Sequence, residues 1–257
     1  MLEKNKKNFI TELYPAIQGE GKWCGHPVIV IRVSGCTHRC YFGEGGWCDS
    51  WYCSWYPQGA NFCFNDVIDM CKKYPYIKEF MLTGGSPTLY PDLIYETLLY
   101  AHANDMKVTM ESEGSMCPSN IGKDNIKIDL LSLSPKFSNS VPKLGTLDPR
   151  GNKVTQQVID QHNKYRLNKE AISQLIQSSI DYQYKPVWDG TEENLKEIED
   201  FRVNMNIPKE KTWLMPAGDN REQLIKVYPD CINKCIELGY NFSGREHIIA
   251  FDKKLGV

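Results

Sequence analysis

The sequence predicts an α/β fold with a largely parallel sheet. Short apolar runs alternate with helical patterns along the 257 residues, and this alternation is typical of βαβ units. We count six strand–helix repeats, fewer than the eight of a closed barrel. The chain is long enough for one large domain, and no stretch has the composition of a linker. We therefore expect a single domain over residues 1–257.

Each strand is predicted from a short apolar run that stops at a turn signal. The first is rich in β-branched residues, and the second breaks at a pair of glycines. In chain order, the predicted strands are Val28–Val33, Glu79–Thr83, Lys107–Met110, Asp129–Leu133, Tyr182–Val187 and Thr212–Met215.

Helices are predicted where apolar residues recur at helical spacing. Asn65 is expected to cap the first of them, which stops near Pro75. Residues 136–168, rich in Ser, Pro, Gly and Asn, interrupt the pattern and are expected to be an inserted loop with a short helix. The predicted helices are Asp66–Lys73, Pro91–Ala103, Lys169–Ser179, Glu192–Met205 and Arg221–Leu238.

Composition excludes several classes of protein. Thirty Lys and Arg face 32 Asp and Glu, a net charge of −2, which argues against direct binding to nucleic acid. Hydrophobic residues make up 41% of the chain, too many for a disordered protein. No apolar run approaches membrane-spanning length, and the N-terminus lacks the apolar region of a secretory signal. We therefore expect a cytoplasmic protein without a membrane partner.

Ten cysteines in a reducing compartment need an explanation other than disulfides. Five of them fall between Cys36 and Cys63, and Cys36, Cys40 and Cys48 share one loop after the first predicted strand. Three close thiolates can hold an iron–sulfur cluster and leave one iron open to a ligand. A structural zinc loop with Cys53 or Cys63 as fourth ligand is the alternative. The spacing alone does not decide between them.

The motifs around the cysteine loop narrow the choice between an iron–sulfur cluster and a zinc site. Gln18-Gly-Glu-Gly21 precedes the first strand, Gly35-Cys36 follows it, and Trp47-Cys-Asp-Ser50 closes the loop. Further motifs follow in order: Thr83-Gly-Gly-Ser-Pro87, Glu111-Ser-Glu-Gly114, Ser132-Leu-Ser-Pro-Lys136, Met215-Pro216 and Arg245-Glu-His247. Over residues 9–257 the chain resembles the 7-carboxy-7-deazaguanine synthases, a family of radical S-adenosylmethionine (SAM) enzymes. Several matches in register are more specific than any one of them.

The resemblance implies an incomplete, open (β/α)6 partial TIM barrel of the radical SAM type. It also implies three cofactors: a [4Fe–4S] cluster held by Cys36, Cys40 and Cys48, SAM on the open iron, and Mg²⁺ at Ser50. A hydroxyl oxygen is a suitable hard ligand for Mg²⁺.

The resemblance also implies the other site residues. Arg32 offers a planar fork for the carboxylate of the substrate, and Glu20 either contacts the substrate or braces Arg32. His247 is a site residue or a structural histidine. The residues expected to bind SAM are Trp47, Asp49, Gly85, Glu111, Ser134, Pro135 and Lys136. Those expected to bind substrate are Ile17, Gln18, Gly19, Glu20, Arg32, Thr83 and Val257.

Two departures from the family pattern affect these expectations. Gly43-Glu-Gly-Gly46 is inserted into the cysteine loop, where glycines let an extra segment bulge without strain. Ser86 stands where the family generally has a glutamate that pairs with the amino group of SAM. Weaker SAM binding, or a substitute carboxylate such as Glu111, is the expected consequence.

The implied activity is the Mg²⁺-assisted ring contraction of 6-carboxy-5,6,7,8-tetrahydropterin to 7-carboxy-7-deazaguanine, with loss of ammonia, in deazapurine (queuosine) biosynthesis. The implied partners are the pterin substrate, an electron donor such as flavodoxin or ferredoxin, and a second copy of the chain in a homodimer. A glycyl-radical-enzyme activase shares the cysteine loop, but the Gln18-Gly-Glu-Gly21 opening and the Arg245…Val257 ending disfavour it. A zinc-stabilised binding module is the non-catalytic alternative.

Overall fold

The computed structural model describes residues 7–42, 46–122 and 125–256. A seven-stranded sheet has the order β3-β1-β2-β4-β5-β6-β7, and a three-stranded sheet has the order β10-β9-β8. The strands of the larger sheet are β1 Asn8–Ile17, β2 Pro27–Val33, β3 Ala60–Phe62, β4 Glu79–Gly84, β5 Lys107–Ser112, β6 Ile128–Leu133 and β7 Ser179–Tyr184. Those of the smaller sheet are β8 Val187–Trp188, β9 Trp213–Pro216 and β10 Asn241–Phe242.

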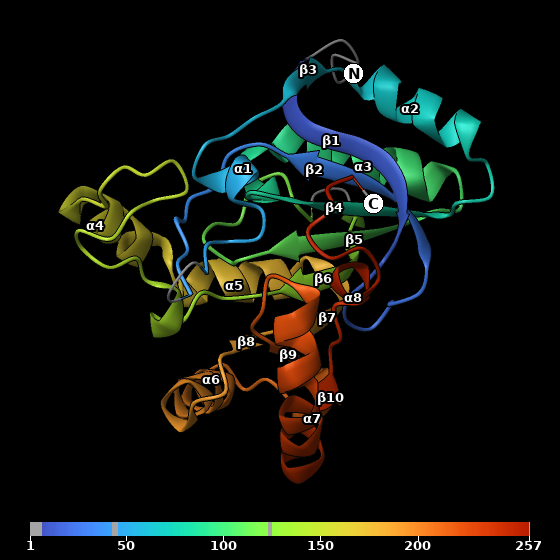
Figure 1. The fold of residues 1–257 in the computed structure, drawn as a ribbon. Coiled ribbons are helices and arrows are strands. Elements are labelled where there is room, and N and C mark those ends of the chain that lie inside the picture. Colours follow the sequence, from blue (N-terminus) through green and yellow to red (C-terminus); the bar gives the residue numbers. More distant parts are fainter. Residues whose placement is uncertain (1–6, 43–45, 123–124, 257) are drawn as a thin grey trace.

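Helices occupy most of the connections between these strands. They are α1 Trp51–Ser54, α2 Phe64–Lys73, α3 Pro91–Ala103, α4 Gln156–Tyr165, α5 Lys169–Gln177, α6 Glu192–Asn204, α7 Arg221–Leu238 and α8 Glu246–Phe251. Figure 1 shows the strands running from β3 and β1 at the top to β9 and β10 at the bottom, where α6 and α7 flank them. None of the helices in the described part of the chain is long and apolar enough to cross a membrane.

The parallel arrangement follows the chain. β2, β4, β5, β6 and β7 are parallel neighbours, and a parallel bridge between Tyr184 and Thr212 connects β7 to the start of the smaller sheet. β8, β9 and β10 are also parallel to one another. The predicted α/β fold with a largely parallel sheet is confirmed. In such a sheet, ligands bind at the carboxyl ends of the strands.

The burial of β2 on both faces explains why its sequence is almost continuously apolar. Ile29 and Ile31 are fully buried in the main core, whereas Val28 and Val30 belong to a second, smaller cluster. Parallel strands covered on both faces need apolar residues at every position. Because side chains alternate along a strand, Arg32 projects on the same side as Val28 and Val30.

Several predicted boundaries differ from the structure by one or two residues, and three of the differences have a clear physical reason or consequence. The cap of α2 is Cys63 rather than Asn65, because Asp66 accepts a hydrogen bond from the backbone N–H of Cys63 at 2.8 Å and so completes a capping box. The predicted strand Tyr182–Val187 is two strands, β7 and β8, separated at Pro186, which has no N–H to donate to a ladder. β7 starts at Ser179, and α5 therefore ends at Gln177.

The strand β1 is absent from the sequence prediction. It runs antiparallel to β2, and its Pro15 and Glu12 obscure the apolar pattern. β3 pairs with residues 8–10 of β1, so Pro15 lies beyond the part of β1 that is paired with β3. A proline is tolerated at such an edge position although it has no N–H to donate. Residues 136–168 contain α4, in agreement with the expected short helix.

Candidate active site

A cleft of about 820 Å³ opens at the carboxyl ends of the parallel strands. It brings together nearly all the residues that the sequence nominates. Those that line it are Ile17, Gln18, Gly19, Glu20, Arg32, Cys36, Cys40, Trp47, Cys48, Asp49, Ser50, Thr83, Gly85, Glu111, Ser134 and Lys136. Pro135 is not among the lining residues, and Val257 lies outside the described residues.

The register of the strands explains this convergence. Arg32 on β2 is paired with Thr83 on β4, and Glu111 on β5 is paired with Ser132 on β6. Neighbouring residues at matching positions of a parallel sheet project to the same side. Motifs that are tens of residues apart in the sequence therefore meet at one rim.

The three cysteines of the loop face the same cleft. Cys40 is buried, and Cys36 and Cys48 are partly buried. Burial raises the pKa of Cys48 to about 12 and also raises the pKa of Cys36 and of Cys40. The thiols are therefore protonated at neutral pH, and a metal centre has to displace these protons when it binds.

The donor set fits a [4Fe–4S] cluster with one open iron. No three of the described His, Cys, Asp or Glu side chains stand close enough to bind a single metal ion, so the fit rests on three thiols from one loop. Trp47 lies between Tyr41 and Trp55, with ring centroids 4.6 and 4.9 Å away, and covers the loop with aromatic surface.

The other two candidate zinc ligands have structural roles. Cys53 is fully buried, and its carbonyl accepts a hydrogen bond from the backbone N–H of Gly35 at 2.7 Å. Cys63 caps α2.

Gly84 and Gly85 let the loop after β4 pack against the loop after β2. A Cβ atom on Gly85 would lie 1.8 Å from the carbonyl oxygen of Gly35, and one on Gly84 would lie 2.4 Å from that of Val33. The backbone N–H groups of Gly85 and Ser86 donate to the carbonyls of Val33 and Gly35, at 3.1 and 2.8 Å. This close approach positions both loops at the rim of the cleft.

Gly85→Ala is expected to lower the free energy of unfolding by about 3 kcal/mol, the upper end for overpacking, because backbone cannot move aside cheaply. Gly145→Ala is the matched control. Gly145 has open space around its position and a φ of +78°, so alanine there costs about 1 kcal/mol of backbone strain. Urea denaturation of both variants measures the difference, and equal losses would contradict the packing argument.

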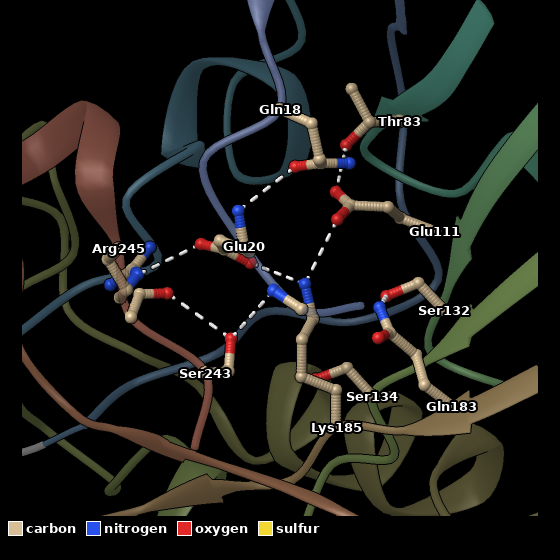
Figure 2. A network of polar contacts seen from close by, with 12 residues as sticks. Gln18, Glu20, Thr83, Glu111, Ser132, Ser134, Gln183, Lys185, Ser243 and Arg245 are labelled. Carbon is tan, nitrogen blue, oxygen red and sulfur yellow. Dashed lines mark hydrogen bonds and ion pairs between the residues drawn. The ribbon is translucent and has the colours of Figure 1, made fainter. Parts of the chain in front are cut away.

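A buried network of ions spans the cleft (Figure 2). The ammonium group of Lys185, 3% exposed, pairs with Glu20 and, at 3.0 Å, with Glu111. Glu111 also accepts a hydrogen bond from the hydroxyl of Thr83 at 2.6 Å. On the other side, Arg245 donates from Nε to Glu20 at 3.0 Å. Glu20 therefore lies between two cations.

The charged neighbours of Glu20 and Lys185 determine whether these two side chains are ionised. Burial would raise the pKa of Glu20, but Lys185 and Arg245 outweigh burial and hold that pKa well below its usual range. Burial would lower the pKa of Lys185, but Glu111 and Glu20 hold it above its ordinary value. Glu20 and Lys185 are thus both charged at neutral pH.

The guanidinium group of Arg32 already has partners within the protein, so it is less available to a substrate than the sequence suggests. Its Nε donates to Glu12 at 2.6 Å, and its Nη atoms lie 3.4 Å from the hydroxyls of Ser50 and Tyr14. The residue that braces Arg32 is therefore Glu12 and not Glu20, which corrects one of the two roles expected for Glu20.

The C-terminal segment completes the cleft. Arg245 pairs with Asp49 of the cysteine loop, and the N–H of Glu246 donates to the carbonyl of Gly19 at 3.0 Å. His247 lies close to Glu20, at 3.9 Å. The sequence marks Arg245 and His247 through a motif, but nothing in it reveals their partners. Figure 1 shows α8 returning to the strands at the front of the molecule.

Comparison with known proteins identifies the family, although no family model matches the chain. The chain is 32% identical over 248 residues to the 7-carboxy-7-deazaguanine synthase of Rhodopirellula baltica, covering 96% of this chain and 88% of the relative. It is 31% identical over 245 residues to the synthase of the same name from Halobacterium salinarum, covering 93% and 88%. The crystal structure of QueE from Escherichia coli superposes with a TM-score of 0.56 at 16% identity, covering 92% and 93%, and supports the fold. The chain therefore belongs to the 7-carboxy-7-deazaguanine synthase family of radical SAM enzymes.

Proposed function

We propose that this chain converts 6-carboxy-5,6,7,8-tetrahydropterin to 7-carboxy-7-deazaguanine with loss of ammonia. The observation that carries the proposal is the single cleft in which the three loop cysteines and the Glu20–Lys185–Glu111 network meet. Membership of the family supports the same reaction. The product serves deazapurine (queuosine) biosynthesis.

Cys36, Cys40 and Cys48 would hold a [4Fe–4S] cluster, which would supply the electron for the reductive cleavage of SAM. These three cysteines and Trp47 line the cleft, and the ring of Trp47 packs against that of Tyr41 in the same loop. The protein's own task is to hold the substrate against the reactive carbon and to exclude solvent.

Carboxylates and amides in the cleft suit the edge of a pterin, which carries both donors and acceptors. Glu20 and Gln18 lie next to each other: the side-chain oxygen of Gln18 accepts from the N–H of Glu20 at 3.2 Å. Lys185 offers an ammonium to the substrate's carboxylate, while Glu111 and Glu20 keep it charged in the free enzyme. Ile17, Gly19, Ser134 and Lys136 also line the cleft, and we assign the first two to the substrate and the last two to SAM.

Ser50 and Asp49 offer hard oxygens for Mg²⁺, with Ser50 Oγ 3.2 Å from Asp49 Oδ1. We expect Ser50→Ala to raise the Mg²⁺ concentration for half-maximal rate by about tenfold. Ser50→Thr keeps the hydroxyl and should behave as the parent protein. The rate is measured against Mg²⁺ concentration after chelation of residual metal, and an unchanged Mg²⁺ dependence in Ser50→Ala would remove this residue from the metal site.

The deciding experiment is an anaerobic assay of reconstituted protein with SAM, Mg²⁺, a reductant and 6-carboxytetrahydropterin, read by mass spectrometry. 7-Carboxy-7-deazaguanine is the expected product. If 5′-deoxyadenosine forms without it, the substrate assignment is wrong. If neither forms although the cluster is present, the proposed reaction is wrong.

The proposal also covers the electron donor, the oligomeric state and the location of the enzyme. We expect an electron donor such as flavodoxin or ferredoxin, a homodimer of single-domain chains, and a cytoplasmic location. Flavodoxin in place of a chemical reductant should sustain turnover.

A further inference from the structure

A buried carboxylate with an unusual environment lies beside the cysteine loop. Glu113 follows β5 directly, is 5% exposed and lines the cleft. Three hydroxyl groups donate to its Oε1: Ser86 at 2.6 Å, Thr37 at 3.0 Å and Ser115 at 2.5 Å. Thr37, Ser86 and Glu113 follow the neighbouring parallel strands β2, β4 and β5.

The hydrogen bonds place Glu113 next to the expected cluster. Ser86 Oγ donates to Glu113, accepts from the backbone N–H of Thr37 at 3.3 Å, and lies 3.3 Å from Cys36 Sγ. Ser86 is short, and its hydroxyl therefore leaves room for the carboxylate of Glu113 to approach from the next strand. The carboxylate lies one hydrogen bond beyond the side chain at position 86.

The charge of Glu113 has no counter-ion among the described residues. No Lys, Arg or His in that part of the chain forms an ion pair with it, and its Oε2 accepts no hydrogen bond there. Three neutral donors on one oxygen suit an ionised acceptor. However, a buried carboxylate without a cation is costly. A cationic ligand in the cleft would remove that cost.

Glu111, the substitute carboxylate suggested by the sequence, is already engaged. It pairs with Lys185 and accepts from Thr83. A second cation would have to compete with that ion pair, whereas Glu113 has a free oxygen and no cation to displace among the residues that the structure describes. Glu113 is therefore better placed than Glu111 to act as the substitute carboxylate.

We propose that Glu113 binds the α-ammonium group of SAM and so replaces the glutamate that is missing at position 86. The inference rests on the proposed function to the extent that SAM occupies the cleft. An ammonium group has three donors and no acceptor, and the unoccupied Oε2 of Glu113 supplies the matching acceptor and charge. Ser86, Thr37 and Ser115 hold the carboxylate in place.

The test measures the affinity of the cluster-loaded, full-length protein for SAM by anaerobic equilibrium dialysis. Glu113→Gln keeps the shape of the side chain and removes its charge. It should weaken SAM binding roughly 10- to 100-fold, the range for a hydrogen bond to a charged group. A SAM analogue with hydrogen in place of the amino group should bind both proteins alike, because it lacks the ammonium.

Two further variants separate charge from structure. Ser86→Glu in the Glu113→Gln background restores a carboxylate at the rim and should recover most of the SAM affinity. Ser86→Ala, which keeps Glu113, should weaken SAM binding less than Glu113→Gln does, because the carboxylate remains and Thr37 and Ser115 still donate to it. Iron content and the electron paramagnetic resonance spectrum of the reduced cluster show that each variant is loaded.

The outcomes are distinct. If the parent protein fails to bind SAM, the proposed function fails with the inference. If the parent binds SAM and Glu113→Gln binds it equally well, the inference alone is overturned. Equal loss of SAM and of the deamino analogue in Glu113→Gln would also overturn it, because the role would then be structural.

Discussion

Cys36→Ala, Cys40→Ala and Cys48→Ala are each expected to lose the iron–sulfur cluster and product formation. The three thiols share one loop and one cleft, and none of the neighbouring cysteines is placed to replace them. Cys53 is buried in α1, and Cys63 caps α2. Because the cluster carries the difficult chemistry, we expect the rate of product formation to fall by roughly 1,000-fold or more.

Iron and sulfide content after anaerobic reconstitution, together with product formation, measures this expectation. Cys24→Ala is the control, because Cys24 is exposed and lies on the turn between β1 and β2; it should keep the full cluster and the parental rate. A loop-cysteine variant that retained four irons per chain and made product would refute the assignment. Stoichiometric zinc in place of iron in the parent protein would revive the zinc alternative.

The parallel strands were predictable because their environment imposes a simple pattern. A strand covered on both faces must be apolar throughout, as β2 is from Val28 to Ile31. β1 escaped prediction because most of its central residues are half-buried and its Pro15 reads as a break. Whether such a strand forms depends on pairing with β2, and this tertiary contact leaves little trace in local sequence.

The site was predictable as a set of residues but not as a set of partners. Motifs at the ends of parallel strands must meet at one rim, and they do so in the cleft. Pairing across the cleft is different: Glu20 and Lys185 are 165 residues apart, and no spacing rule relates them. Arg32 illustrates the same limit, since its expected free fork is taken up in part by Glu12.

The second large effect is expected at Lys185. Lys185→Met should lower the free energy of unfolding by about 3–5 kcal/mol, because it leaves Glu20 and Glu111 in a buried site without the cation between them. It should also abolish measurable turnover if this ammonium holds the substrate's carboxylate. Urea denaturation at pH 7 and the product assay measure the two effects separately.

The pH dependence of this loss has a definite sign. Burial opposes ionisation of Glu20, but the cations lower its folded-state pKa, so its contribution to stability is present above the unfolded pKa and disappears as pH falls. Burial likewise opposes the charge on Lys185, but its partners raise its pKa, so that contribution disappears as pH rises beyond the unfolded value. The difference in stability between parent and Lys185→Met should therefore be largest from about pH 5 to 9 and shrink on both sides.

Two variants test whether the effect of Lys185→Met on stability comes from the lost positive charge or from the altered side chain. Lys211 pairs with Asp181 nearer the surface, with 32% of the lysine side chain exposed, so Lys211→Met should cost no more than about 1 kcal/mol. The combination of Lys185→Met with Glu111→Gln removes the carboxylate that has lost its cation, while Glu20 keeps Arg245; it should recover most of the lost stability, but not turnover. If Lys185→Met cost as little as Lys211→Met, the three charges would not be coupled as the structure indicates. If the combined variant turned over substrate, the network would serve folding alone and the substrate's carboxylate would have to bind elsewhere in the cleft.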